Sequence, residues 1–272
     1  VQYMDHIHDR NNSIRQMNFP YPSFMPGQED MIDLVSSQLN ENSSLLLQAP
    51  TGSGKTIAIL FAALKALESN KKDRIFYFTS KTTGKREAED NLEKIVVSGV
   101  KIRSVTITAK EKICPVPDSA CNSTECELAR DYYSKRNDAL LFLLGFEHCG
   151  LDKLYLAVHI YGICPFELSL DLSEYCDIII CDVNYLIHPA ARLSRFFQIQ
   201  QFPGLSGEYI SLIDEAHNLP DRARSNYSIT ISRDEIMKVQ RQVKSVSLSI
   251  HRAYMKITKI LAHLRDDTSL NS

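Results

Sequence analysis

Short apolar runs, each ended by polar residues or glycine, recur along the chain and predict the strands of a buried sheet. The segments between them show helical patterns: Ile57–Leu67 is rich in good helix formers, and Met31, Leu34 and Val35 fall on one helical face. Strands that alternate with helices in this way are typical of an α/β domain with a parallel sheet. The predicted strands are residues 45–47, 74–79, 102–107, 176–182 and 209–213.

Two parts of the chain depart from this alternation. Residues 108–170 carry five cysteines among Pro, Asn and Asp, and they predict an insertion that needs a staple of its own. Residues 228–272 predict helices, because Ser232 and Glu235 form a capping box and an apolar stripe at helical spacing begins at Ile250. Residues 1–18 show no convincing period and are treated as a lead-in.

Composition narrows the class of protein. With 272 residues, 44% hydrophobic and 24% charged, the chain can bury a core and form one large domain or two smaller ones. The formal net charge of −2 gives no bulk basic field, so any nucleic-acid binding must come from local patches. No apolar run approaches the ~20 residues that span a membrane, and the first residues do not resemble a signal peptide. We expect a cytoplasmic protein, or a nuclear one in a eukaryote, and the initial Val1 suggests a piece of a longer chain.

The segment Gln48–Thr56, Gln-Ala-Pro-Thr-Gly-Ser-Gly-Lys-Thr, follows the first apolar run and predicts a phosphate-binding loop. Its glycines allow backbone N–H groups to turn inward, and the following helix adds its positive end. Lys55 would reach the outer phosphates of ATP, and the Thr56 hydroxyl would ligate Mg²⁺. Ala49 stands where the usual pattern has its first glycine. The predicted ATP-binding residues of the loop are Pro50, Thr51, Gly52, Ser53, Gly54, Lys55 and Thr56.

Asp214 and Glu215 directly follow the apolar strand 209–213, where the second half of an ATPase site is expected. Asp214 would hold Mg²⁺ opposite the loop, and Glu215 would orient the attacking water or accept its proton. Gln28, upstream of the loop, would read the adenine edge with its amide, or would be a surface residue at a helix start. The predicted catalytic residues are Lys55 and Glu215.

The polar segment Ser80–Lys85 ends the strand 74–79, on the side of a parallel sheet where ligands bind. Its hydroxyls and lysines suit contacts with a phosphate backbone, and a solvated loop is the alternative.

Four of the seven cysteines have spacing that suits a metal centre. Cys114, Cys121 and Cys126 lie on one loop, and Cys164 returns later in the chain. Four thiolates can hold either a zinc ion or a 4Fe–4S cluster, and spacing alone does not separate the two. Cys149 is the rival candidate. Cys176 and Cys181 bracket a strand at an odd spacing, which predicts buried thiols on opposite faces of the sheet.

Taken in order, these motifs resemble a superfamily 2 helicase of the DEAH type, and the cysteine insertion resembles the iron–sulfur branch, the XPD/DinG helicases. The loop 49–56 and Asp214-Glu215-Ala216-His217 carry the resemblance. Pro26-Gly27-Gln28 is similar to the family's Gln motif, although Met25 stands where Arg is frequent. Three further segments are similar to family motifs, namely Ser80-Lys81-Thr82, Cys164-Pro165-Phe166 and Cys181-Asp182-Val183-Asn184-Tyr185-Leu186.

The resemblance covers about residues 19–227 and implies a RecA-like domain that binds ATP together with a second RecA-like domain of the same parent chain. It implies a 4Fe–4S cluster on Cys114, Cys121, Cys126 and Cys164, and 5′→3′ translocation on single-stranded DNA held near Lys81, Thr82 and Asn184. The expected organisation is a lead-in at 1–18, the RecA-like domain at 19–107 and 171–227, the iron–sulfur insertion at 108–170 and the start of a helical Arch-like domain at 228–272.

Two other classes of function fit the residues. One is a RecA-type ATPase that remodels RNA or protein. The other is a zinc-stapled nucleic-acid-binding module whose ATP site is vestigial, although Lys55 and Glu215 are both present.

Overall fold

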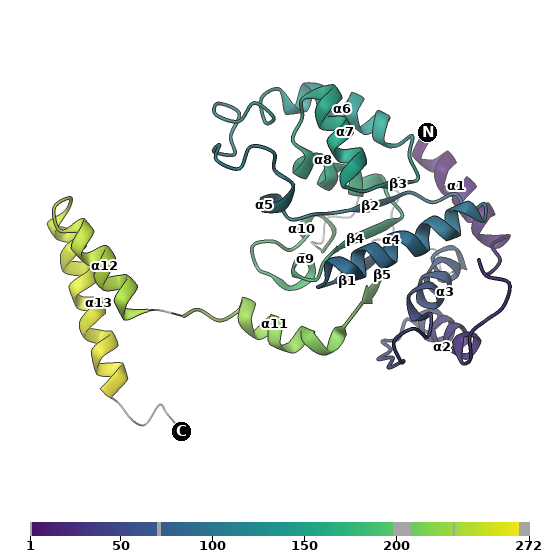
Figure 1. Ribbon diagram of the computed structural model, residues 1–272, viewed down its shortest axis with the longest axis horizontal. Helices are drawn as coiled ribbons and strands as arrows, with labels where there is room; N and C mark the ends of the chain where they lie inside the picture. Colours follow the sequence, from purple (N-terminus) through teal and green to yellow (C-terminus); the bar gives the residue numbers. More distant parts are fainter. Residues whose placement is uncertain (1, 70–71, 198–207, 231, 267–272) are drawn as a thin grey trace. The chain divides into compact units, whose positions relative to one another are not determined.

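The computed structural model describes residues 2–69, 72–197, 208–230 and 232–266 (Figure 1). The chain divides into two compact units, Val1–Pro220 and Asp221–Ser272, which are described separately. Some residues of the predicted segments 171–227 and 228–272 lie outside the described residues. No helix in the described part of the chain has the length and apolar character needed to cross a membrane.

The first unit is built on a parallel sheet of five strands in the order β3-β2-β4-β1-β5. Its α/β class and parallel sheet confirm the predicted fold class. Every residue of β1 is buried, as expected for a strand between two helical layers. The strands are β1 (Arg74–Thr79), β2 (Ser104–Thr106), β3 (His148–Cys149), β4 (Ile178–Asp182) and β5 (Tyr209–Ile213).

Alternate residues of the strands pack into two separate hydrophobic cores, one on each face of the sheet. Phe76 and Ile179 pack with residues of α6 (Tyr132–Leu143), α7 (Leu151–Tyr161) and α8 (Pro165–Leu172). Ile75 and Ile178 pack with residues of α3 (Lys55–Ser69) and α4 (Thr82–Val97) on the other face. Figure 1 shows these two helical groups on opposite sides of the strands. The carboxyl ends of the strands therefore meet at one edge between two helical layers.

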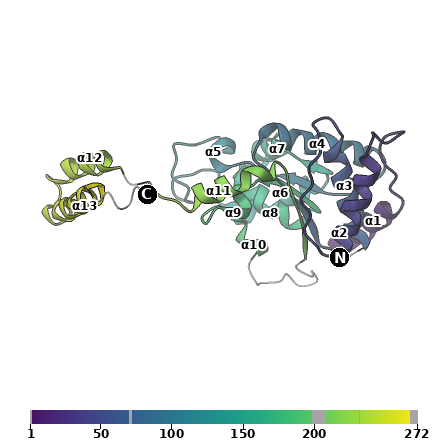
Figure 2. The same cartoon turned by 90° about the horizontal axis from the view of Figure 1, so that it is seen from below.

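Other elements complete the two units. α2 (Gln28–Asn40) packs on α3. The shorter helices are α5 (Lys110–Ile113), α9 (Asn184–Ile187), α10 (Ser194–Phe197) and α11 (Leu219–Asn226), with 3₁₀ turns at Ser173–Tyr175 and Ala216–Asn218. In the second unit α12 (Arg233–Val243) and α13 (Leu248–Asp266) lie side by side (Figure 2). Ser232 Oγ accepts the backbone N–H of Glu235, which confirms the predicted cap.

The first predicted strand is wrong. Residues 45–47 form no strand, and Leu46 is 87% exposed. A strand needs a neighbour to satisfy its backbone groups, and in the described sheet no strand pairs with this segment. The apolar residues of this run have high β-propensity, but propensity alone does not form a strand when no neighbouring strand pairs with it.

The lead-in is also not structureless, because Gln2–Arg15 forms helix α1. This helix is anchored just before β4 by the buried carboxylate of Asp177, which lies 2.9 Å from Arg10 Nη1 in an ion pair and 2.7 Å from His6 Nε2 in a hydrogen bond. Ile14 adds an apolar contact to the core that contains α3. The side of the helix that packs on the protein carries the buried, charged Arg10, so a search for apolar residues at helical spacing does not find it.

Two smaller expectations need correction. Leu34 does not share the buried face of α2 with Met31 and Val35, since it is 45% exposed. Cys176 and Cys181 are buried as predicted, but both belong to the same core cluster. Cys176 precedes the first residue of β4, so the alternation of a strand does not apply to it.

Candidate nucleotide site and adjoining cavity

The predicted phosphate loop has the backbone that anion binding requires. Gly52 and Gly54 have φ values of 80° and 69°, which are left-handed conformations that favour glycine. Helix α3 begins at Lys55, and the backbone N–H of Ala58 donates to Gly54 O at 3.2 Å. The first turn of α3 therefore directs its positive end to the place where phosphates would lie.

Gln28 is bound to this loop. Its Nε2 donates to Gly54 O at 3.0 Å, and its Oε1 accepts the N–H of Met25 at 3.0 Å. The residue is only 2% exposed. A Cβ on Gly54 would lie 2.3 Å from Gln28 Nε2, so this contact needs glycine. Gln28 thus shapes the phosphate loop, and its adenine contact stays a prediction.

Thr56, the predicted Mg²⁺ ligand, has its hydroxyl inside a polar group of side chains. Thr56 Oγ1 donates to Glu87 Oε1 of α4 at 2.7 Å. Tyr77 of β1 lies near Thr56, and burial and the charge of Asp214 raise the pKa of Tyr77, so its phenol is neutral. The loop is thereby joined to α4 and to the end of β1.

Asp214 follows β5 and lies beside the end of β1. Its backbone N–H donates to Phe78 O at 2.8 Å, and its Oδ2 accepts from Thr79 Oγ1 at 3.0 Å. A Cβ on Gly84 would lie 2.4 Å from Thr79 Oγ1 and 2.8 Å from Asp214 Oδ2, so α4 approaches the carboxylate closely only because position 84 is glycine. The Asp214 carboxylate is therefore held at the end of β1, against the first turn of α4.

Glu215 is held by an exposed ion pair. Lys81 Nζ lies 2.7 Å from Glu215 Oε1, and His217 Nδ1 lies 3.3 Å from Oε2. The Lys81 hydrogen bond and charge lower the pKa of Glu215, with a smaller contribution from the charge of Lys55. Glu215 is therefore an anion in the electrostatic range of the loop lysine, and its backbone has a left-handed φ of 53°.

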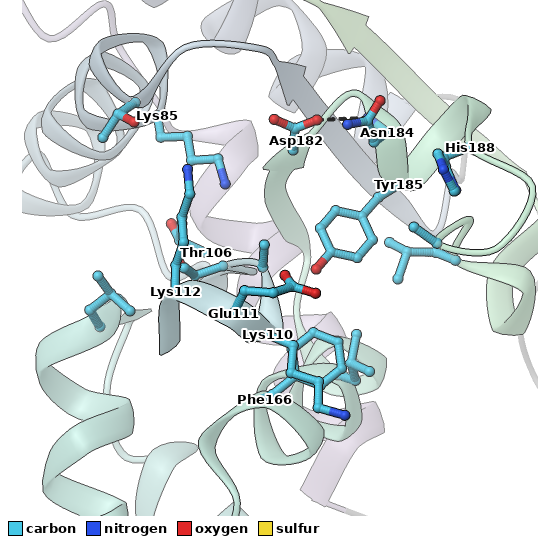
Figure 3. Close-up of a pocket in the computed structure, with 18 of the residues that line it drawn as sticks. Lys85, Thr106, Lys110, Glu111, Lys112, Phe166, Asp182, Asn184, Tyr185 and His188 are labelled. Atoms are coloured by element: carbon cyan, nitrogen blue, oxygen red, sulfur yellow. Dashed lines mark hydrogen bonds between the residues drawn. The ribbon is translucent and has the colours of Figure 1, made fainter. Parts of the chain in front are cut away.

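A large cavity of about 1270 Å³ adjoins this edge (Figure 3). It is lined by the predicted DNA contacts Thr82 and Asn184, whereas Lys81 is outside its lining. Asn184 is fixed by its backbone N–H, which donates to Asp182 Oδ1 at 2.9 Å. Six Lys or Arg and four Asp or Glu side chains line the cavity, which gives it a modest cationic excess: Lys85, Arg86, Lys110, Lys112, Arg192 and Arg195 against Glu89, Glu111, Asp152 and Asp182.

One wall of the cavity is stiffened by a hydrogen-bonded chain. Glu89 of α4 accepts from Thr106 Oγ1, and His148 Nε2 lies 3.5 Å from the same carboxylate. His148 Nδ1 lies 2.9 Å from Ser104 Oγ. Burial opposes ionisation of Glu89, but the hydrogen bonds of His148 and Thr106 outweigh it and lower its pKa. The wall therefore presents a fixed carboxylate.

The four predicted cluster ligands share one neighbourhood. The backbone N–H of Cys164 donates to Leu128 O at 3.0 Å, which brings the start of α8 to the loop after Cys126. The Lys110 ammonium group lies near Cys121 and Cys164, and Cys114 lies near Cys164. Among the described residues, however, no three Cys, His, Asp or Glu side chains lie close enough to hold a metal ion. The donor chemistry fits a thiolate-bound group, and the ligating geometry is not formed.

Cys149, the rival ligand, belongs to the core. It lies in β3, is 2% exposed and donates from Sγ to Leu143 O at 3.4 Å. Burial raises the pKa of its thiol to about 12. A neutral, packed thiol is a poor metal ligand.

Three side chains of the nucleotide site were not found from the sequence: Tyr77, Thr79 and Glu87. Tyr77 and Thr79 alternate within an apolar strand, and Glu87 is one of several acidic residues on a polar helix. No motif spacing marks them. The position of Thr79 at a strand end was the only available signal.

A parallel sheet with a phosphate loop opening α3 and an acidic pair after β5 defines a P-loop NTPase domain of the RecA type. The chain belongs to the DEAD_2 family, whose model matches residues 90–236. The model described as DEAD/DEAH box helicase matches residues 25–115.

Curated relatives agree with this family. The chain is 22% identical over 266 residues to the general transcription and DNA repair factor IIH helicase subunit XPD of Dictyostelium discoideum, with 84% of the chain and 33% of the relative covered. It is 23% identical over 272 residues to the regulator of telomere elongation helicase 1 homolog of Caenorhabditis elegans, with 84% and 26% covered. The chain thus spans between about a quarter and a third of the length of these curated relatives.

Solved structures show the same fold. A structure titled XPD_Helicase aligns with a TM-score of 0.60 at 22% identity and covers 89% of this chain and 41% of its own. A structure titled Truncated XPD aligns with a TM-score of 0.57 at 23% identity and covers 86% and 65%. The predicted XPD-like recognition is therefore confirmed.

Proposed function

We propose that the chain is the first motor domain of an ATP-dependent DNA helicase. The observation that carries the proposal is that the predicted phosphate loop opens α3 and the pair Asp214 and Glu215 follows β5, with a cavity lined by Thr82 and Asn184 nearby. Membership of the helicase family and the printed names of the relatives support it. ATP hydrolysis would drive 5′→3′ translocation on single-stranded DNA and unwinding of the duplex.

In this proposal the loop residues Pro50–Thr56 bind the ATP phosphates, and Lys55 neutralises their outer charge. Thr56 and Asp214 would hold Mg²⁺, which would balance the charge that develops on the leaving phosphates. Glu215 orients the attacking water and accepts its proton. A second RecA-like domain of the parent chain would close the site, and Gln28 would contact the adenine.

Lys81, Thr82 and Asn184 would hold the DNA strand. The cavity supplies lysines and hydroxyls of the kind that bind phosphate oxygens, with a modest cationic excess. Contacts of these side chains with phosphates do not depend on the bases, so the affinity for single-stranded DNA should vary little with its sequence. A cytoplasmic location, or a nuclear one in a eukaryote, would suit this role.

Residues 108–170 would carry a 4Fe–4S cluster on Cys114, Cys121, Cys126 and Cys164. The cluster would tie the loop to α8, since the loop 114–126 has little apolar packing of its own, with only Cys126 buried there. Residues 228–272 would begin an Arch-like helical domain, and residues 19–107 and 171–227 would form the motor domain.

Nucleotide and strand binding by this chain test the proposal. We expect weak, Mg²⁺-dependent binding of a fluorescent ATP analogue, and Lys55→Ala should weaken it at least tenfold, since it removes a charge-assisted phosphate contact. Single-stranded DNA should bind, with little or no unwinding by this chain alone. Preference for single-stranded RNA over DNA would favour the RNA-remodelling alternative. Robust strand separation by these residues would contradict the need for a second domain.

Metal analysis of anaerobically purified protein tests the cluster. We expect bound iron and a brown colour with broad absorbance at about 400 nm, as iron–sulfur proteins show. Substitution Cys164→Ser should remove both, and Cys149→Ser should leave both. A colourless, zinc-loaded protein prepared without oxygen would overturn the assignment.

A further inference from the structure

Glu87 lies against the hydroxyl predicted to ligate the metal ion. Thr56 Oγ1 donates to Glu87 Oε1 at 2.7 Å, although the two residues are 31 positions apart in the chain. Thr56 is only 5% exposed, so its surroundings are set by the protein and not by solvent. Helix α4, which carries Glu87, thus reaches into the nucleotide site.

The hydrogen bond determines how the Thr56 oxygen is presented. A hydroxyl has one hydrogen and two lone pairs, and a metal ion can use only a lone pair. With its hydrogen directed to Glu87, Thr56 keeps its lone pairs turned away from that carboxylate. An acceptor at position 87 therefore fixes the orientation that metal ligation needs.

The two faces of α4 explain why Glu87 reaches this site. Gly84, Glu87 and Asn91 recur at helical spacing on one face, where Asn91 Nδ2 donates to Glu87 O at 2.7 Å and Gly84 meets Thr79 and Asp214. Thr82, Lys85 and Glu89 lie on the opposite face and line the cavity. One helix therefore serves both the nucleotide edge and the cavity.

We infer that Glu87 is a positioning residue for the metal ligand Thr56. Its carboxylate accepts the Thr56 hydrogen while the oxygen binds Mg²⁺, so it acts on the metal through another residue. The inference rests on the proposed function, because it assumes that a Mg²⁺–nucleotide complex binds at the loop.

The test separates metal affinity from nucleotide affinity. Binding of a fluorescent ADP analogue is measured in EDTA and in a Mg²⁺ titration, for the unsubstituted chain and for Glu87→Ala, Glu87→Gln and Glu93→Ala. We expect equal affinities in EDTA. In Glu87→Ala the Mg²⁺ concentration for half-maximal enhancement should rise roughly 10- to 100-fold, the usual effect of losing a hydrogen-bond partner of a metal ligand. Glu87→Gln should recover part of the loss, because its amide oxygen still accepts.

Glu93 is the matched control, since it is an exposed glutamate on the same helix and should leave the titration unchanged. Thermal melting checks that each variant is folded. An unchanged Mg²⁺ titration in Glu87→Ala overturns the inference, and so does an equal loss in EDTA, which would indicate a general disturbance of the loop. If the unsubstituted chain binds nucleotide without any Mg²⁺ effect, or binds none, the proposed function fails first.

Discussion

The two ends of the parallel strands carry carboxylates paired with cations, and the pairs differ in burial. Before β4, Asp177 is 1% exposed and lies 2.7 Å from His6 Nε2 and 2.9 Å from Arg10 Nη1. After β5, Glu215 is 31% exposed and its partner Lys81 is 54% exposed. A buried charge cannot lose its partner without a large desolvation penalty, whereas water can replace an exposed partner. The pair before β4 is therefore suited to stabilising the fold, and the pair after β5 is suited to exchanging one partner for a ligand.

Backbone contacts reinforce this contrast. Asp177 Oδ2 also accepts the N–H of Arg103 at 2.8 Å, so the carboxylate joins α1 to the segment before β2. Glu215 has a positive φ and lies two residues after the end of β5, with its carboxylate bound to the exposed side chain of Lys81. Substitutions at the two ends should therefore change different measurable quantities.

The largest effect is expected from Asp177→Asn. The amide keeps the shape of the carboxyl group but cannot balance Arg10, which is 4% exposed. Loss of one partner of a buried pair costs about 3–5 kcal/mol, and we expect a decrease of that size in the free energy of unfolding. Urea unfolding followed by circular dichroism measures it. The matched control is Asp9→Asn, which breaks the exposed pair with Lys101 and should cost less than about 1 kcal/mol. Equal losses in the two variants would remove the contrast between the strand ends.

The same variant has a pH signature. Burial opposes ionisation of Asp177, but the His6 hydrogen bond and the Arg10 charge outweigh it and lower its pKa. An unfolded Asp has a pKa of about 3.9, so the stabilisation is complete above that pH and is lost as the pH falls through the lower folded pKa. The stability difference between unsubstituted chain and Asp177→Asn should stay constant from pH 7 to 5 and shrink only in stronger acid. A difference that shrinks already above pH 5 would show that another group titrates.

Patterns with local causes were predictable. Tyr209–Ile213 was predicted with the bounds of β5, and Ser232 with its capping partner, because alternation and capping involve neighbouring residues. The phosphate loop was predictable for the same reason, since its glycines, Lys55 and Thr56 are contiguous.

Features decided by distant partners were not predictable. Helix α1 was missed because side-chain contacts with Asp177, about 170 positions away, anchor it. The run 45–47 was misassigned because pairing, which the run itself cannot reveal, decides whether a strand forms. Glu87 is indistinguishable from Glu93 in the sequence, and only the fold brings one of them to Thr56. The contiguous motifs of the site could therefore be predicted from the sequence, whereas the long-range contacts that orient their side chains could not.

The smallest effect on stability is expected from Lys81→Gln. This variant also tests whether Lys81 can exchange its partner Glu215 for a DNA phosphate. The Glu215 hydrogen bond raises the pKa of Lys81, so the lysine is charged at neutral pH. Because the pair is exposed, the free energy of unfolding should be nearly unchanged. If Lys81 contacts a DNA phosphate, single-stranded DNA should bind several-fold more weakly for any sequence, and the slope of log affinity against log salt should fall by about one. Fluorescence anisotropy over a salt series measures both.

Lys101→Gln is the control for that experiment, because Lys101 is also an exposed, paired lysine but precedes β2, at the opposite end of the parallel strands from Lys81, which follows β1. It should leave DNA affinity and salt slope unchanged. The two lysines have similar pairs at 2.7 and 3.1 Å, so a difference between them has to come from location and not from the ion pair. If both variants lower DNA affinity equally, the effect is one of net charge. If only Lys81→Gln does, the lysine that holds Glu215 also contacts DNA, and the strand competes with the carboxylate for the same ammonium group.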